Sequence, residues 1–401
     1  MTTTPAPART AAPAPATPVT TTVTTTATLC RDPAAFAALA PEWDALYARC
    51  PGATPFQTHA WLHSWWLSYG VRGRLRLLLV RSGGRLVGVA PLMCVYRPFP
   101  VLVPLGGDIT DFLDVLVDAD RADVALRAME RGLRRAARGA LVDLREVRPG
   151  GAAERLHNRW QGARRRLDDS VCLELPGVPL EDLLRRMPGT SARRTRGKLR
   201  RLARLDLEER DVPQAEVASA VATLLRLHGL QWRGRGLTPE HGRRRFAEHL
   251  SRAAVRMVGN GDAVLTEYRV GGEVLATDMT LTSAELSGGY LYGAHPALRA
   301  KADITSMLLR HDARLASESG RRVLSMLRGT EPYKRHWRPV EVTNRRLLLA
   351  RSELAPLLRL YAGLLTVRRR LGRAVREHGP ALVALRARLR AHRPRAFRAD
   401  A

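Results

Sequence analysis

The chain has 401 residues, of which 45% are hydrophobic, so it is long enough and apolar enough to bury the cores of two ordinary domains. This composition excludes a chain that is disordered throughout. Its 66 basic residues outnumber the 38 acidic ones, and the formal net charge of +28 favours polyanionic partners such as nucleic acid, acidic lipid surfaces or phosphorylated substrates. The arginines are scattered, however, and a GC-rich genome that writes Arg for Lys explains the same excess.

The cysteines and the apolar runs narrow the class of protein further. The four cysteines are widely spaced and form no C-x-x-C pair, which argues against a disulfide framework or a zinc site. No run of about 18 apolar residues is present, so we expect no transmembrane helix. The N-terminus lacks the charged start and apolar core of a secretory signal, and we expect a cytoplasmic protein.

The N-terminal region begins with a low-complexity segment. Residues 1–28 are almost entirely Thr, Ala and Pro, so we expect a disordered tail there. Apolar residues at three- and four-residue steps then predict a helix over 36–46, and the aromatic-rich segment 59–69 predicts a second one. The tryptophans of this second helix fit core or interlobe packing better than stacking on a substrate.

A strand-rich block follows these helices. Apolar runs at 75–81 and 85–95, separated by Ser82-Gly83-Gly84, predict a β-hairpin. The remaining elements predicted for this α/β unit are strands at 102–105, 112–117, 140–147 and 171–175 and a helix at 122–138. Asp108, Asp111 and Asp114 recur at three-residue steps, but strand alternation separates them and no His accompanies them, so we expect no metal site.

A basic helix opens the second half of the chain. Residues 192–205 carry seven cations and no acid, behind a Pro-Gly-Thr-Ser break that caps the helix. Two of the cations, Arg194 and Lys198, are candidates for clamping a phosphate or an acidic substrate at this helix. A solvated basic face explains the same pattern.

Helices and then a meander follow the basic helix. Two helices are predicted after it, at 214–233 and 246–257, and a shorter one before it, at 181–187. Strands at 263–270, 273–283 and 287–292, joined by short polar or Gly-containing turns, predict an antiparallel meander. Asp278 lies in the middle strand, where an apolar residue is expected, and is a candidate for a base with a tuned pKa. The exposed face of a half-buried strand is the alternative.

The most informative stretch closes the second half. A helix over 302–318 and a buried strand over 321–327 lead into Arg328-Gly329-Thr330-Glu331-Pro332-Tyr333-Lys334-Arg335-His336-Trp337. Gly329 permits a tight turn and Pro332 prevents the strand from continuing. The chain has only three lysines, and Lys334 in this turn can stabilise an oxyanion as a compact ammonium, which a guanidinium does less well. A solvated turn is the alternative.

The C-terminal region is a basic tail. Residues 351–401 hold 13 arginines against three acids, a net charge of +10, and Pro380 divides the tail into two amphipathic segments. Such a tail suits an anionic membrane surface or nucleic acid. It equally suits an appendage that packs on the core through its leucines.

Several passages together resemble a known family. The order strand, strand, strand, helix, strand, with a motif at its close, resembles the GNAT acyltransferase fold. The passages that carry the closer resemblance are residues 61–66, 84–92, 106–118, 193–204, 227–232, 290–296 and 328–334. In this order they resemble the CelD-type acetyltransferase family associated with cellulose biosynthesis. That family is related to the Fem-type peptidyl transferases, which carry two GNAT-like lobes.

The resemblance implies an α/β fold with tandem GNAT-like lobes, each a mixed, mostly antiparallel sheet flanked by helices. It places the lobes at 29–175 and 176–350, with the active site in the second and the basic helical tail after it. It also implies transfer of an acyl group, such as acetyl, from acyl-coenzyme A to an amine or hydroxyl, without a metal. The acceptor class stays open between a small molecule, a glycan and a peptide.

The resemblance also implies roles for particular residues. Asp278 or Glu331 is expected to act as the base, Tyr333 as proton donor to the leaving thiolate, and Lys334 as anion stabiliser. The residues expected to hold the coenzyme A pyrophosphate are Thr305, Ser306, Arg299 and Lys301. The residues expected to bind the acceptor are Arg194, Lys198, His228, Trp232, Arg328 and Trp337.

The chain departs from the family pattern at two places. Ala302-Asp303-Ile304 stands where members carry Ser-Pro-Gly before the pyrophosphate-binding helix, and Ser325 stands where they carry Asp. Two other functions therefore stay open. One is a Fem-like transferase that uses aminoacyl-tRNA, and the other is a non-catalytic protein that binds nucleic acid or a membrane surface through its basic tail.

Overall fold

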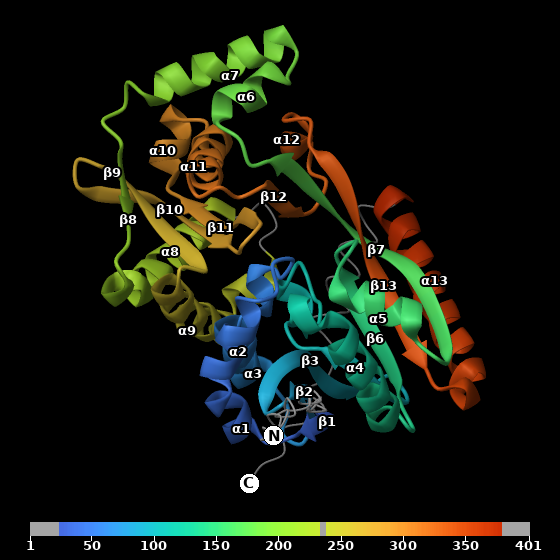
Figure 1. Cartoon of the computed structure of the whole chain (residues 1–401). Coiled ribbons are helices and arrows are strands. Elements are labelled where there is room, and N and C mark those ends of the chain that lie inside the picture. Colours follow the sequence, from blue (N-terminus) through green and yellow to red (C-terminus); the bar gives the residue numbers. More distant parts are fainter. Residues whose placement is uncertain (1–23, 233–237, 379–401) are drawn as a thin grey trace, which may run out of the picture.

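The computed structural model describes residues 24–232 and 238–378, and a single sheet of 13 strands runs through them (Figure 1). The strand order is β1-β2-β3-β4-β6-β13-β7-β12-β11-β10-β9-β8, with the short β5 paired to β3. The predicted α/β class is confirmed. No helix among the described residues is both long enough and apolar enough to cross a membrane.

The first half of the chain (residues 24–176) forms one end of this sheet with its helices. Its elements are β1 (Thr25–Cys30), α1 (Pro33–Ala38), α2 (Ala40–Tyr47), α3 (His59–Tyr69), β2 (Leu75–Ser82), β3 (Arg85–Tyr96), β4 (Pro100–Pro104), β5 (Leu116–Val117), α4 (Ala122–Ala136), β6 (Leu141–Val147), α5 (Ala152–Arg159) and β7 (Ala163–Pro176).

The second half (residues 180–350) forms the other end, and one more helix follows it. Its elements are α6 (Leu180–Arg185), α7 (Gly189–Leu202), β8 (Glu208–Asp211), α8 (Val217–Trp232), α9 (Arg244–Asn260), β9 (Ala263–Val270), β10 (Glu273–Thr282), β11 (Leu286–Ala294), α10 (Pro296–Lys301), α11 (Ile304–Glu318), β12 (Val323–Arg328), α12 (Pro332–Arg335) and β13 (Val340–Ala350), followed by α13 (Ala355–His378).

Most locally encoded elements lie where the sequence predicts them. The hairpin β2–β3 and the meander β9–β10–β11 are confirmed, both fully antiparallel. The helix predicted over 36–46 is instead two helices, because Leu39 ends α1 and Pro41 starts α2. The strand predicted over 112–117 is wrong except for β5, since the preceding residues form a loop that reaches the second half. Strand β1 begins at Thr25, within the predicted tail, whose residues 1–23 lie outside the described chain.

Two long strands are shared by the two halves. Strand β13 lies between β6 and β7, pairing antiparallel with both, although it closes the second half of the sequence. Strand β7 in turn pairs with β12 through Glu174, Leu175 and Pro176. Each half therefore shows the same arrangement: an antiparallel meander, one parallel neighbour (β4 with β6, β11 with β12), and then the two shared strands. A boundary at residue 175 consequently does not separate two independent sheets.

The hydrophobic core also joins the two halves. In β2, Leu75, Leu77 and Leu79 pack into one cluster, while Leu78 and Val80 pack into another on the opposite face. Burial on both faces explains why this strand is a continuous apolar run rather than an alternating one. The first cluster lies under α1–α3 and continues beneath α8 and α9 of the second half. Helices α4 and α5 cover the other face of the first half, and α6, α7 and α11 cover that of the second (Figure 1).

Candidate functional site

A cavity of about 540 Å³ lies between the two halves. Its walls come from α3, from the loop after β4, from the segment before α9, and from β11 and the end of β12. The residues that line it are Trp65, Tyr69, Gly107, Asp108, Ile109, Asp111, Thr238, Glu240, His241, Arg245, Tyr290 and Arg328. A concave site with aromatic walls and a few charged groups is typical of a small-molecule or substrate site.

One wall of this cavity is a linked aromatic and charged group. Trp65 and Tyr69 stack with ring centroids 5.5 Å apart, and the Arg245 guanidinium lies 4.9 Å from the centre of the Tyr69 ring. The Tyr69 hydroxyl donates to Glu240 at 3.0 Å, and Arg245 donates two hydrogen bonds to the same carboxylate at 2.6 and 2.7 Å. Burial raises the pKa of Glu240, but the bonds from Arg245 and Tyr69 outweigh it and leave the pKa below its usual value. The wall therefore presents an ionised carboxylate.

The opposite wall is built around Arg328, one of the residues predicted to bind the acceptor. Its Nε donates to Asp111 at 2.9 Å, its backbone N–H donates to the same carboxylate at 3.2 Å, and its other guanidinium nitrogens reach Glu146 at 3.2 Å and the Asp108 carbonyl at 2.6 Å. Burial raises the pKa of Asp111, and the Arg328 charge opposes this shift. Arg328 therefore ties β12 to the loop and to β6 of the first half.

The turn after β12 fixes the direction of Arg328. Leu327, with a φ of 56°, lies in a bulge of β12 after which Arg328 still pairs with Cys172 of β7, and Gly329 has a φ of 113° where the strand ends. The positive φ of Gly329 favours glycine at this position, and a Cβ added there would also lie 2.4 Å from the Glu331 carboxylate. Lys334 is buried, with its Nζ donating to the Arg328 carbonyl at 2.8 Å and lying 3.0 Å from Glu331. This lysine is a support of the turn as well as a candidate for chemistry.

The predicted catalytic residues lie on the α11 side of the sheet rather than in the cavity. Tyr333 is 46% exposed on α12, and burial together with the charge of Glu331 and the neighbouring Tyr292 raises its pKa. Tyr292 is the register partner of Asp278 in the adjacent strand β10. Tyr292 thus lies beside Asp278 and close enough to Tyr333 to influence its pKa.

Asp278 is itself deeply buried. Thr280 donates a hydrogen bond to Asp278 at 3.1 Å or to Asp312 at 2.8 Å, so the two carboxyls share one hydroxyl. Burial and the neighbouring Asp312 raise the pKa of Asp278 well above its usual value. His311 lies beside them, and burial lowers its pKa while Glu209 and the aspartates raise it to a net increase. The arrangement holds a proton inside the second half.

The start of α11, where the sequence predicts pyrophosphate binding, carries its own carboxylate. Asp303 is the N-cap and accepts from the Ser306 backbone N–H at 2.9 Å, while Lys198 of α7 donates to the other Asp303 oxygen at 2.8 Å. Thr305 lies half-buried on this first turn. Burial raises the pKa of Asp303, but the bonds from Lys198 and Ser306 hold it below its usual value. One anion position at this helix start is thus filled by the chain itself.

The remaining predicted residues are dispersed. Arg299 donates to the Gln231 carbonyl at 3.2 Å, and Lys301 is exposed on α10. Arg194 is exposed on α7, and Trp337 is buried in the core cluster beneath α11.

His228 is the predicted acceptor residue that comes nearest the cavity without lining it. Its Nδ1 lies 2.7 Å from the Tyr292 carbonyl, and its Nε2 lies 3.2 Å from Nδ1 of His241, which lines the cavity. The side chain of Trp232, also predicted to bind the acceptor, lies outside the described residues.

The two tyrosines of β11 lie on opposite sides of the sheet. Parallel pairing of β11 with β12 covers Leu286 with Val323 and Ser287 with Leu324. Further along β11, Tyr292 packs on the α11 side, while Tyr290 lines the cavity and its hydroxyl donates to the Ile109 carbonyl at 2.9 Å. Among the described residues no group of His, Cys, Asp or Glu suits a metal ion.

Sequence reasoning missed most of the cavity. No role was predicted for Tyr69, Glu240, Arg245 or Tyr290, and only the folded chain brings them together. One signal was present in the sequence. Asp108, Asp111 and Asp114 accept hydrogen bonds from Arg145, from Arg328 and from the start of α5, respectively. Three acids in a mainly apolar segment indicated that this loop has polar contacts elsewhere in the fold.

Comparison with known proteins agrees with this architecture. Residues 190–335 match the model of a family described as acetyltransferase (GNAT) domain. The crystal structure of FemX superposes with a TM-score of 0.55 over 77% of this chain and 95% of FemX, at 13% identity. The fold is of the GNAT type.

A second structure supports the same fold. The C-terminal domain of a protein named as a lysylphosphatidylglycerol synthetase from Agrobacterium fabrum superposes with a TM-score of 0.51 at 12% identity, over 82% of this chain and 96% of that domain. No curated protein matches the sequence. At these identities the likeness concerns the GNAT-type fold, and it agrees with the duplicated pattern of strands described above.

Proposed function

We propose that this protein is a GNAT-type acyltransferase that moves an acyl group from acyl-coenzyme A to an amine or hydroxyl of an acceptor held in the cavity between the two halves. The observation that carries the proposal is the position of that cavity. It is bounded by β11 and the end of β12, both within the part of the chain that matches the acetyltransferase model. Arg328, which lines the cavity, is followed directly by the turn that carries Glu331, Tyr333 and Lys334.

The charged walls suit such an acceptor. The ionised Glu240 offers a hydrogen-bond acceptor to an amine or hydroxyl, while Trp65 and Tyr69 offer flat apolar surface. Arg328 is held by two carboxylates, so it acts by shaping the cavity and keeping the two halves in register rather than by moving a proton. Direct attack of the acceptor on the thioester also requires a base and a proton donor for the leaving thiolate.

Glu331, Tyr333 and Lys334 are the residues we assign to that chemistry. Glu331 is half exposed and accessible as a base, and Tyr333 is exposed next to it, with a raised pKa that keeps its proton available for the leaving thiolate. The Lys334 ammonium is compact and is available to stabilise a developing oxyanion. Asp278 is buried and does not line the cavity between the two halves, so we assign it the role of a proton-holding support behind Tyr292.

The finer assignment concerns the acceptor. The resemblance of passages such as 84–92 and 328–334 to the CelD-type family favours an acceptor from polysaccharide or cell-envelope biosynthesis. The acyl chain fits the description of the matching model, an acetyltransferase, and we propose acetyl as the group transferred.

A direct test combines binding and turnover. Acetyl-coenzyme A at about 100 times its dissociation constant should raise the free energy of unfolding by about 2.7 kcal/mol, because it binds only the folded chain. Thiol release in the presence of pooled amine and hydroxyl acceptors should then fall by about 100-fold in Tyr333→Phe, since general acid catalysis contributes roughly that much. Arg335→Ala, whose side chain is paired with Glu341 nearby on the surface, is the matched control and should keep its activity. Full activity in Tyr333→Phe would remove Tyr333 from the site.

A specific observation favours a second function. The Asp303 carboxylate, bonded to Ser306 and Lys198, already occupies one anion position at the start of α11. This carboxylate disfavours a pyrophosphate at the helix start. An acyl donor that carries no pyrophosphate, such as aminoacyl-tRNA, does not meet this obstacle. The exposed cations of α7 and the net charge of +28 suit this polyanion. This alternative predicts tight, salt-sensitive binding of charged tRNA and no stabilisation by acetyl-coenzyme A. Stabilisation by acetyl-coenzyme A with no tRNA binding at moderate salt would reject it.

A further inference from the structure

The outer face of α13 is an apolar stripe with no covering element among the described residues. Leu360, Leu364, Val367 and Leu371 are 58%, 52%, 55% and 61% exposed. Steps of four, three and four residues place them on one side of the helix. The opposite side is buried, with Leu358, Tyr361 and Ala362 packed in the main core beside β7 and β13. In Figure 1 this helix lies along the outside of the molecule.

Arginines flank this stripe. At 3.6 residues per turn, Arg368 lies roughly 70° to one side of the stripe and Arg370 roughly 90° to the other. Arg369, between them in sequence, is turned inward and bonds to the Asp168 and Asp169 carbonyls, which fixes the rotation of the helix. No acidic residue occurs from 355 to 376. The exposed face is therefore apolar at its centre and cationic along both edges.

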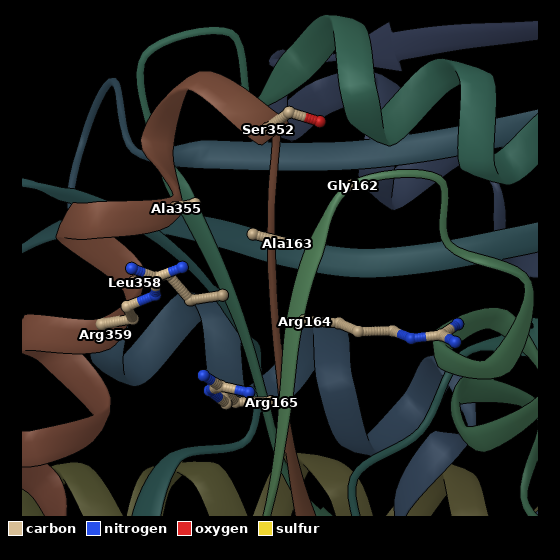
Figure 2. A pocket seen from close by; sticks show the side chains of 8 residues that line it. All are labelled: Gly162, Ala163, Arg164, Arg165, Ser352, Ala355, Leu358 and Arg359. Atoms are coloured by element: carbon tan, nitrogen blue, oxygen red, sulfur yellow. The ribbon is translucent and has the colours of Figure 1, made fainter.

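A basic cavity of about 340 Å³ lies at the start of the same helix. Its lining residues are Gly162, Ala163, Arg164, Arg165, Ser352, Ala355, Leu358 and Arg359 (Figure 2). Figure 2 shows Arg165 and Arg359 on the α13 side of β7, whereas Arg164 points away and donates to the His157 carbonyl at 2.8 Å. In the described part of the chain, neither Arg165 nor Arg359 forms an ion pair with a carboxylate. Two unpaired guanidinium groups at a small cavity suit one phosphate.

We propose that α13 docks the protein on the surface of a bilayer that contains anionic lipids. The stripe of Leu360, Leu364, Val367 and Leu371 inserts into the boundary between headgroups and acyl chains, and the flanking arginines contact lipid phosphates. The cavity at Arg165 and Arg359 holds one phospholipid headgroup. A second copy of the chain is a poorer occupant, because two such faces would bring the arginines that flank each stripe together. The charge of the face complements an anionic partner.

The test uses the full chain and sedimentation with vesicles. Wild-type protein should bind vesicles of phosphatidylcholine with about 30% phosphatidylglycerol about tenfold more strongly than vesicles of phosphatidylcholine alone. Leu360, Leu364, Val367 and Leu371 changed together to Ser should lower binding to the mixed vesicles by about tenfold or more, with unfolding unchanged because these side chains are exposed. Leu67→Ser is the matched control, since Leu67 is 57% exposed on α3, and should bind as wild type does.

The remaining outcomes decide against the proposal or locate the headgroup. Unchanged vesicle binding in the serine variant, or equal binding to both kinds of vesicle, would overturn it. A wild-type dimer in light scattering that the serine variant loses, without vesicle binding by either protein, would show that the stripe binds a second copy and would also overturn it. Arg165→Gln with Arg359→Gln should weaken binding to the mixed vesicles severalfold while the stripe is intact.

Discussion

Replacing Arg328 by Met should show how firmly the two halves are held together. Arg328 is 26% exposed and forms ion pairs with Asp111 and Glu146, whose side chains are 13% and 8% exposed. Met fills the space of the alkyl stem but leaves two nearly buried carboxylates without their cation. Breaking a buried pair by removing one partner costs about 3–5 kcal/mol, so the free energy of unfolding should fall by roughly that amount at neutral pH.

The pH dependence separates this explanation from a loss of packing. Burial already raises the pKa of Asp111 despite the Arg328 charge, and without that charge its folded-state pKa rises further. A carboxyl with a raised folded-state pKa stabilises the protein at pH values below its unfolded pKa and loses this contribution as the pH rises towards the folded value. The deficit of Arg328→Met should therefore be smaller at about pH 5 than at about pH 8.

Urea unfolding followed by tryptophan fluorescence measures this deficit. Arg196→Met is the matched control, because Arg196 and Glu181 are 40% and 61% exposed and the pair should contribute less than about 1 kcal/mol. The double variant Arg328→Met with Asp111→Asn should recover part of the loss, since it removes one of the stranded charges. A deficit for Arg328→Met that is below about 1 kcal/mol, or that stays constant with pH, would show that the ion pairs of Arg328 do not hold the two halves together.

Three further predictions concern single positions. Asp303→Asn keeps the helix cap but removes its charge, so acetyl-coenzyme A should bind about tenfold more tightly in calorimetry if the start of α11 holds the pyrophosphate. Unchanged affinity would place the cofactor elsewhere. Asp278→Asn should flatten the decline in unfolding free energy between about pH 5 and about pH 8, because the raised pKa of Asp278 makes the wild type lose stability as the pH rises. An unaltered pH profile would show that another group causes the decline. Trp337→Ala should lower the free energy of unfolding by about 3–5 kcal/mol, as for a core aromatic, and Tyr333→Ala by about 1 kcal/mol or less. Equal effects of the two changes in thermal unfolding would contradict the burial of Trp337.

The sequence by itself determined the elements whose signals are local. The hairpin β2–β3 follows from two apolar runs around Ser82-Gly83-Gly84, and α3 follows from its aromatic spacing. The end of β12 follows from Gly329 and Pro332, and the position of Arg328 at the end of this strand was visible in the same way. Hydrophobic period and turn chemistry act over a few residues, so they can be seen without the fold.

The tertiary structure decided what depends on distant pairing. Strand β13 was not predicted, because it becomes a strand by inserting between β6 and β7, nearly 200 residues earlier in the chain. The ion pair between Arg328 and Asp111 also depends on distant pairing. The two residues lie 217 positions apart, and the sequence around either one does not indicate the other as its partner. For Asp303, the sequence showed an acid where the resembling family carries none. It did not show that this acid bonds to Ser306 and Lys198. Local sequence selects which side chains are available, and the shared strands decide which of them meet.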